Sequence, residues 1–246
     1  MKSIKPSNIA LAAFALFTAL WIAGETFSIP GLDNLGLMTL VAVALVLAYY
    51  YLRFEERDTD TKTIAVLGML SALAVAGRVL MAPIPNVQPA TFIIIVAGYV
   101  FGPLSGFMVG STTALVSNFL LGHGPWTIWQ MLAWGLAGLT AGLLGKGKHL
   151  EGRLRLSIFC AAWGFLYGWM LTIYFVFGFV RPLTFRAFLT AFATGLWFDT
   201  FHAAGNFVFA FLLGPALVVM LRRYRSRFQF EHADGLPERG AEVGRI

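Results

Sequence analysis

Long apolar runs, separated by short polar, proline-rich or glycine-rich breaks, dominate the pattern along this chain. A membrane-spanning helix needs about 20 predominantly apolar residues, and most of these runs approach that length. The run 90–101 is short for a span, and Gly102-Pro103 separates it from the next run. The pattern predicts an all-α integral membrane protein with eight crossings, at residues 8–29, 35–54, 63–82, 90–101, 104–121, 126–144, 156–179 and 200–221.

A charged stretch at residues 53–62 is the best candidate for a boundary along the chain. The apolar runs on either side of it differ in number, with two before it and six after it. The sequence therefore predicts an extra two-helix transmembrane hairpin with its linker at residues 1–62, a six-helix core at residues 63–222, and a charged tail at residues 223–246.

Two segments leave alternatives open. Lys2 and Lys5 precede the apolar run 9–23, as in a signal peptide, but no convincing small-x-small cleavage site follows, and we expect a retained helix. The segment 184–198 is apolar but is interrupted by Arg186. Because a charged side chain is costly inside a bilayer, we expect this segment to be interfacial or re-entrant.

Composition agrees with a membrane protein and excludes other classes. Hydrophobic residues make up 58% of the chain and charged residues 12%, about half the charged fraction of a soluble domain. The formal net charge of +6 comes from basic residues at the ends of spans, without the basic stripe that nucleic-acid binding needs. The single cysteine, Cys160, lies in an apolar run, so there is no disulfide framework.

Basic residues gather in alternate loops, which predicts the orientation in the membrane. Lys62, Lys146, Arg153 and the cluster 222–227 belong to one set of loops, whereas the opposite loops hold few basic residues. Loops rich in lysine and arginine remain in the cytoplasm. We therefore expect both termini to be cytoplasmic and the proline loop, the Gly-His-Gly-Pro turn and the Arg181 region to face outward.

The run from Gly122 to Gly135 contains the most distinctive cluster of side chains. Glycine and proline end one helix and begin the next. Trp126, Gln130 and Trp134 then recur every four residues and share one helix face. An uncharged amide between indoles favours a wall that holds a ligand, and the alternative is an aromatic belt with helix packing.

Polar side chains near the outer ends of other spans are further candidates for the site. Arg78, just inside the third span, either snorkels to the interface or faces an internal cavity and donates to a polar or anionic group. Asp199, His202 and Asn206 share one face of the last span, which must avoid lipid. They bind substrate or hydrogen-bond across helices, and Asn118 is a similar case.

The large side chains Trp163, Tyr167, Met170 and Tyr174 fall on one face of the seventh span. Such a stripe is more often packing than a ligand wall, and Tyr174 is the member that we keep as a candidate for the site. The histidines and Cys160 show no metal-ligand spacing, and no phosphate-loop or nucleophile motif stands out. We therefore expect no enzyme activity, no cofactor and no metal.

From about residue 64 to residue 221, roughly two thirds of its length, the chain resembles the substrate-binding S component of energy-coupling-factor (ECF) vitamin transporters. Small residues at four-residue spacing, a proline-rich loop and the tryptophan-containing run together carry the resemblance. These motifs are Gly68-x-x-x-Ala72-x-x-x-Ala76, the loop 82–89, the segment 97–110 and the Gly-Pro-Trp-Thr-Ile-Trp-Gln-Met run 124–131.

The resemblance implies a protein of the bacterial cell membrane that binds a vitamin-like small molecule from outside. It also implies a partner, a membrane coupling subunit that carries two cytoplasmic ATPases, and toppling of the S component in the bilayer. By the same resemblance, Gly68, Ala72 and Ala76 dock on that partner, and the proline loop with Asn86 and Gln88 covers the site as a lid.

The Asn-Val-Gln-Pro loop and the tryptophan-containing run look most like S components linked to cobalamin or related corrinoids. Two other classes of protein remain open. A non-transport membrane scaffold of similar six-helix fold would bind no small ligand with high affinity, and a self-sufficient secondary transporter would need no ATPase partner. The hairpin at residues 8–54 is not among the usual six spans of the family, and the sequence assigns it no role.

Overall fold

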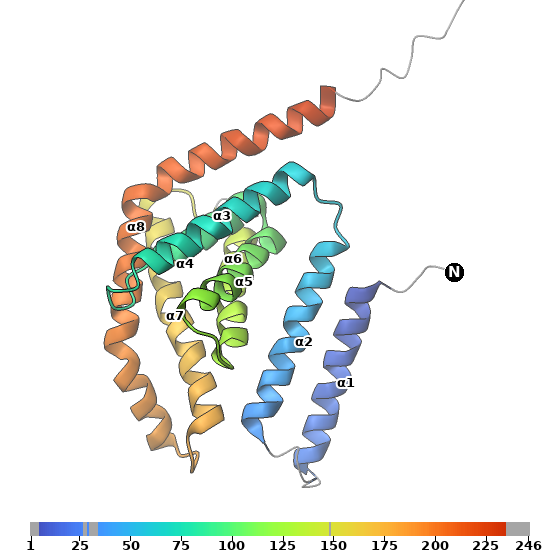
Figure 1. Ribbon diagram of the computed structural model, residues 1–246, viewed down its shortest axis with the longest axis vertical. Helices are drawn as coiled ribbons and strands as arrows, with labels where there is room; N and C mark the ends of the chain where they lie inside the picture. The colour runs from blue at the N-terminus through green and yellow to red at the C-terminus, as the bar shows by residue number, and fades with distance from the viewer. Residues whose placement is uncertain (1–4, 27–28, 30–33, 148, 235–246) are drawn as a thin grey trace, which may run out of the picture.

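The computed structural model describes residues 5–26, 29, 34–147 and 149–234, and these residues form helices joined by short loops (Figure 1). Seven helices of the described part are long and apolar enough to cross a membrane. The predicted all-α membrane fold is therefore confirmed. The helices are α1 (Pro6–Thr26), α2 (Leu35–Glu55), α3 (Thr61–Leu80), α4 (Ala90–Phe101), α5 (Pro103–Leu121), α6 (Trp126–Lys146), α7 (Arg153–Phe179) and α8 (Phe185–Asp234).

Helix α4 lies at the centre of the bundle. It has only 12 residues, as the sequence indicated, and every one of them is buried. Helices α3, α5, α6, α7 and α8 all pack against it. A helix that is apolar on all sides must be covered by other helices or by lipid, and here the neighbouring helices cover it.

Glycines allow α4, α5 and α6 to approach backbone to backbone. A Cβ atom on Gly106 would lie 2.4 Å from the carbonyl oxygen of Gly138 and 2.5 Å from the Cα of Gly98. No real side chain fits in that space. Close approach through small residues replaces the hydrophobic driving force that is missing between helices in a bilayer.

Two helical hairpins flank this centre (Figure 1). Helices α7 and α8 run side by side, and α1 and α2 form the hairpin on the other side. Helix α2 contacts the core through Tyr50, whose ring stacks on Phe107 of α5 with 4.2 Å between centroids. At the C-terminus of α2, the Glu56 carboxylate accepts hydrogen bonds of 2.6 Å from the backbone N–H and the hydroxyl of Ser7, which lies at the start of α1.

The structure corrects the expectation that residues 184–198 form a separate or re-entrant element. They form the first part of the 50-residue helix α8, continuous with the last predicted span and with the start of the predicted tail. No proline interrupts the helix before Pro215, and Arg186 lies exposed near its beginning. A proline within a helix produces a kink, and Figure 1 shows α8 bending away from α7 in its later part.

Arginines of α8 close the end of the bundle that carries the basic loops, called here the basic end. Arg225 donates to the carbonyl oxygen of Val100, and Arg222 donates to the hydroxyl of Tyr99 at 2.9 Å. Helix α4 ends at Phe101, so these cations lie at its C-terminus, where the helix dipole favours positive charge.

Candidate substrate-binding site

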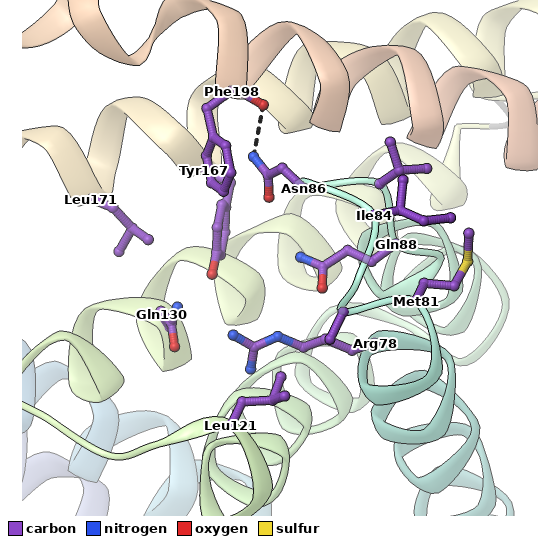
Figure 2. A pocket seen from close by; sticks show the side chains of 12 residues that line it. Arg78, Met81, Ile84, Asn86, Gln88, Leu121, Gln130, Tyr167, Leu171 and Phe198 are labelled. Atoms are coloured by element: carbon purple, nitrogen blue, oxygen red, sulfur yellow. Dashed lines mark hydrogen bonds between the residues drawn. The ribbon is translucent and has the colours of Figure 1, made fainter.

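A cavity of about 260 Å³ lies beneath the loop between α3 and α4, residues 81–89, called here the lid loop (Figure 2). Side chains from α3, the lid loop, α5, α6, α7 and α8 converge on it. Its lining residues are Arg78, Met81, Ala82, Ile84, Asn86, Val87, Gln88, Leu121, Gln130, Tyr167, Leu171 and Phe198. The cavity therefore combines an apolar wall with a few polar groups, as small-molecule sites do.

Arg78 is the cationic group of this cavity and is 9% exposed. Its Nη1 donates to Ser117 Oγ and, at 2.8 Å, to Asn118 Oδ1, both on α5. These are the guanidinium hydrogen bonds found within the described residues, so Nε and Nη2 remain as donors for a group in the cavity. The sequence left Arg78 between snorkelling and facing an internal cavity, and the structure places it at the cavity.

Asn118 joins Arg78 to α6. Its Nδ2 donates to Gln130 Oε1 at 2.7 Å and to Thr127 Oγ1 at 2.8 Å. Gln130 is thus held from behind, with its oxygen already engaged, and Figure 2 shows the hydroxyl end of Tyr167 pointing toward it. The network fixes the polar side of the cavity in one arrangement, because each buried partner satisfies another.

Stacked aromatic rings form the layer behind the polar groups. The guanidinium of Arg78 lies 4.8 Å from the ring centroid of Trp134, which stacks on Tyr167 at 4.8 Å. The indole Nε1 donates to Thr91 Oγ1 at 2.9 Å, and that hydroxyl is 2.8 Å from His202 Nε2. A desolvated cation–π contact contributes about 2 kcal/mol, so Trp134 supports the position of Arg78.

The lid loop is held over the cavity at two points. Asn86 adopts a left-handed backbone conformation with φ of +54°, and its Nδ2 donates to the carbonyl oxygen of Phe198 on α8 at 2.8 Å. At the other end of the loop, Pro89 packs on Gly77, where an added Cβ would lie 2.5 Å from the proline ring. Asparagine tolerates the left-handed region better than most residues, so this position suits the conformation.

Residues 58–223 match the protein family described as ECF-type riboflavin transporter, S component. The chain belongs to this family. It is thus a member of a family of transporter subunits, and it shares their membrane location. A curated relative, a UPF0397 protein of Vibrio atlanticus (strain LGP32), is 29% identical over 108 residues. That match covers 41% of this chain and 59% of the Vibrio protein, and no solved structure matches the chain significantly.

The cavity of this S component brings together four of the residues that the sequence suggested for the site: Arg78, Asn86, Gln88 and Gln130. Asn118 lies behind them and orders two of them. The four-residue spacing of Trp126, Gln130 and Trp134 predicted one wall of the site on α6. Only the middle residue lines the cavity, however, since Trp134 is fully buried beneath it and Trp126 is 41% exposed.

The polar face of α8, which carries Asp199, His202 and Asn206, is buried. The sequence predicted this burial because polar side chains must avoid lipid. Asp199 borders a neighbouring cavity, whereas His202 and Asn206 are enclosed between helices. In the described part of the chain, His202 Nδ1 and the side-chain amide of Asn206 have no hydrogen-bond partner. Tyr174 packs beside Trp129, 6.0 Å between centroids, and does not line the cavity.

Sequence reasoning missed several lining residues, and Tyr167 is the most important of them. Tyr167 was one member of a stripe interpreted as packing, and it does pack on Trp134 while also bordering the cavity. A signal was available, because Gly164 and Gly168 bracket it and let α8 approach that face of α7. Met81, Ile84, Leu121, Leu171 and Phe198 are apolar and carried no comparable signal.

A separate feature lies on the outer surface of α3. Gly68, Ala72 and Ala76 are exposed and line an open, apolar groove of about 540 Å³ with Thr112 and Val116 of α5. The glycines of α4, α5 and α6 differ from this row of small residues. Backbone atoms of neighbouring helices already fill the space beside them. An added Cβ at Gly68 would meet nothing within 4 Å, so this row is free of intramolecular packing.

Proposed function

We propose that this chain is the high-affinity substrate-binding subunit of an ATP-driven ECF-type uptake transporter for a vitamin-like small molecule. The observation that carries the proposal is the cavity beneath the lid loop. Arg78, Gln130, Asn86 and Gln88 offer donors and acceptors to one cavity, and the network through Asn118 orders Arg78 and Gln130 in advance. Preorganised polar groups reduce the cost of ordering on binding.

Access from the outer face is part of the proposal. The lid loop joins the ends of α3 and α4 that lie away from the charged linker and from Arg222 and Arg225, and the distribution of basic residues assigns those charged ends to the cytoplasm. On this orientation the substrate enters beneath the lid loop from outside, and both termini are cytoplasmic.

The size of the cavity bears on the substrate. Drug-sized ligands occupy pockets of about 300–1,000 Å³. A cavity of about 260 Å³, with a neighbouring one of about 410 Å³, suits a vitamin of one to three rings. The sequence motifs favour cobalamin or a related corrinoid, but a corrin macrocycle with its side chains and nucleotide loop is far larger than either space. We therefore favour a compact vitamin, such as the riboflavin in the family description.

The groove along Gly68, Ala72 and Ala76 supports the proposed partner. A membrane coupling subunit that carries two cytoplasmic ATPases would place a helix against this row, because small residues allow close helix contact without burying polar groups. The groove is already shaped and apolar, and no part of the described chain fills it. The α1–α2 hairpin contacts the core through α2 and leaves this groove open.

Uptake by cells tests the proposal against its two rivals. The chain is expressed alone, with a coupling subunit and active ATPases, and with ATPases that cannot hydrolyse ATP, and labelled riboflavin and cobalamin are supplied. We expect uptake of one of them only with active ATPases. Uptake by the chain alone indicates a secondary transporter. Absence of uptake, together with absence of vitamin binding by the purified chain, indicates a scaffold.

A further inference from the structure

A cavity of about 180 Å³ lies at the basic end of the bundle, between the start of α7 and the later part of α8. Two arginines and one glutamate line it together with Tyr99 and several apolar side chains. We propose that this cavity binds the headgroup phosphate of an anionic phospholipid. It shares no lining residue with the cavity beneath the lid loop, so the inference does not depend on which vitamin the protein binds.

The cavity exists because α8 separates from α7 at this end. Just before that point the two helices are in close contact, since an added Cβ on Gly214 would lie 2.8 Å from Leu156 Cδ2. Pro215 follows directly, and α8 bends away from α7 in its later part (Figure 1). Pro215, Val218 and Val219 line the resulting space on the α8 side. The proline thus opens a wedge with mostly apolar walls.

The charged groups around the cavity leave one positive charge without a counterion. Arg222 donates to the Tyr99 hydroxyl at 2.9 Å and lies 3.6 Å from Glu151 Oε1, in an exposed ion pair that is weak. Arg153 lies over the ring of Phe211, 5.1 Å from its centroid, and pairs with no carboxylate of the described residues. A phosphodiester carries one negative charge and therefore balances two guanidinium groups and one carboxylate.

The N-terminus of α7 favours an anion at the same place. Arg153 is the first residue of α7, and Gly152 before it has φ of +101° and offers no side chain to cap the helix. The first turn contains no acidic residue, whereas Arg153 and Arg155 both lie in it. The free backbone N–H groups and the positive end of the helix dipole attract negative charge and repel cations. An anion in the cavity would compensate the arginines and the helix end together.

Apolar side chains that face outward beside the cavity indicate a lipid as the source of the phosphate. Leu154 and Ile158 on α7 are exposed there, and so are Val219 and Met220 on α8. Both helices are long and apolar enough to cross a membrane, so these side chains contact acyl chains. A phosphate held in the cavity would leave its own acyl chains along this surface. Basic pockets between transmembrane helices bind anionic headgroups in this manner.

Two pairs of variants test the inference in the purified full-length protein. Arg153→Gln removes a cation of the cavity, and Arg155→Gln makes the same charge change on the same helix outside the lining. Val219→Phe narrows the cavity without changing charge, and Met220→Phe enlarges the adjacent exposed residue, which does not line it. Each protein is incubated in detergent with phosphatidylglycerol or with phosphatidylcholine of the same acyl chains. Native mass spectrometry then counts the retained lipid, and melting curves verify folding.

We expect the wild-type protein to retain one phosphatidylglycerol and to prefer it over phosphatidylcholine by at least about tenfold, as hydrogen bonds to charged groups imply. Arg153→Gln and Val219→Phe should lose this preference. Arg155→Gln and Met220→Phe should keep it within about twofold of wild type. Because one cavity variant changes charge and the other changes shape, either of them decides the question if the other fails to fold.

Four outcomes would overturn the inference. The first is equal retention of the two lipids by the wild type. The second is an equal loss in Arg153→Gln and Arg155→Gln, because general attraction between the basic end and an anionic membrane then suffices. The third is a phosphate adduct in place of the lipid when inorganic phosphate is offered, which assigns the cavity to a free anion. The fourth is loss of the coupling subunit in Arg153→Gln with unchanged lipid retention, which assigns it to a protein partner.

Discussion

Nη1 of Arg78 on α3 donates a hydrogen bond of 2.8 Å to Oδ1 of Asn118 on α5, and the same asparagine donates from its Nδ2 to Gln130 on α6. One amide side chain therefore connects three helices at the cavity. The Asn118 oxygen accepts from the Arg78 guanidinium, and the Asn118 nitrogen donates to the neutral oxygen of Gln130. A hydrophobic residue of similar size could do neither. The arrangement explains how a charged side chain is kept at membrane depth without lipid contact.

Replacing Asn118 should weaken both the fold and ligand binding. Asn118→Ala leaves the Arg78 donor and the Gln130 oxygen without this partner, and each unsatisfied buried group costs about 1–3 kcal/mol. We expect a lower melting temperature in detergent and a weaker affinity for the vitamin that the wild-type protein binds. Val116→Ala, on the same helix but 41% exposed, is the matched control for both measurements. Unchanged affinity in Asn118→Ala contradicts the role given to the network.

Bulky residues in the α3 groove should separate docking from substrate binding. Ala72→Leu and Ala76→Leu each place a larger side chain in the groove that these residues line. A partner helix can then no longer approach closely. We expect loss of the complex with the coupling subunit in size-exclusion chromatography, with vitamin affinity within about twofold of wild type. Leu189→Phe enlarges an exposed residue on α8, outside the groove, and should leave the complex intact. A complex that persists in both groove variants excludes this surface as the docking site.

Close packing at the centre makes Gly106 intolerant of even one methyl group. In Gly106→Ala the added Cβ would lie 2.4 Å from the Gly138 oxygen, and overpacking of this kind costs at least about 1–3 kcal/mol. We expect a reduced yield of monodisperse protein and a lower melting temperature. Gly68→Ala is the control, since nothing lies within 4 Å of that position and alanine favours a helix. Equal stability of the two variants would refute the packing described for α4, α5 and α6.

The end of the α1–α2 hairpin that contains Glu56 should loosen in acid. Ser7 donates its hydroxyl and its backbone N–H to the Glu56 carboxylate, and these hydrogen bonds hold the pKa of Glu56 below its ordinary value. A lowered pKa in the folded state means that the contact stabilises the hairpin above the ordinary glutamate pKa. This stabilisation is lost as the pH falls through the lower folded value.

Hydrogen exchange of the first turn of α1, corrected for the intrinsic rate at each pH, measures this effect. Protection should be constant near neutral pH and should fall below about pH 4.3, the unperturbed glutamate value. Glu56→Gln should show the low-pH exchange already at pH 7, and Glu55→Gln, at an exposed neighbour, should behave like wild type. Protection that does not depend on pH in the wild type removes Glu56 from this role.

Helix positions could be predicted because apolar length and breaks decide them. The charged linker and the proline loop separate helices where the pattern placed them, and Gly102-Pro103 marks the end of α4 and the first residue of α5. The exception is residues 184–198, where Arg186 was given too much weight. An arginine near a helix end reaches polar surroundings through its long side chain, so it need not end the helix.

The contents of the site could be predicted only in part, because they depend on the rotation of each helix. Four-residue spacing places Trp126, Gln130 and Trp134 on one face, but the depth of each depends on how α6 meets α5 through Gly138 and Gly106. Tyr167 reaches the cavity only because α7 packs against α6 and α8. Such contacts between distant segments have no local signature in the sequence.

Native mass spectrometry of the gently purified protein tests the central claim most directly. The wild-type protein should carry a single small molecule of vitamin mass, and Arg78→Gln should lose it while remaining folded by its melting curve. The exposed variant Val116→Ala should retain it. Absence of any bound molecule from the wild type, even after incubation with a panel of vitamins, would contradict the account, as would equal retention in Arg78→Gln.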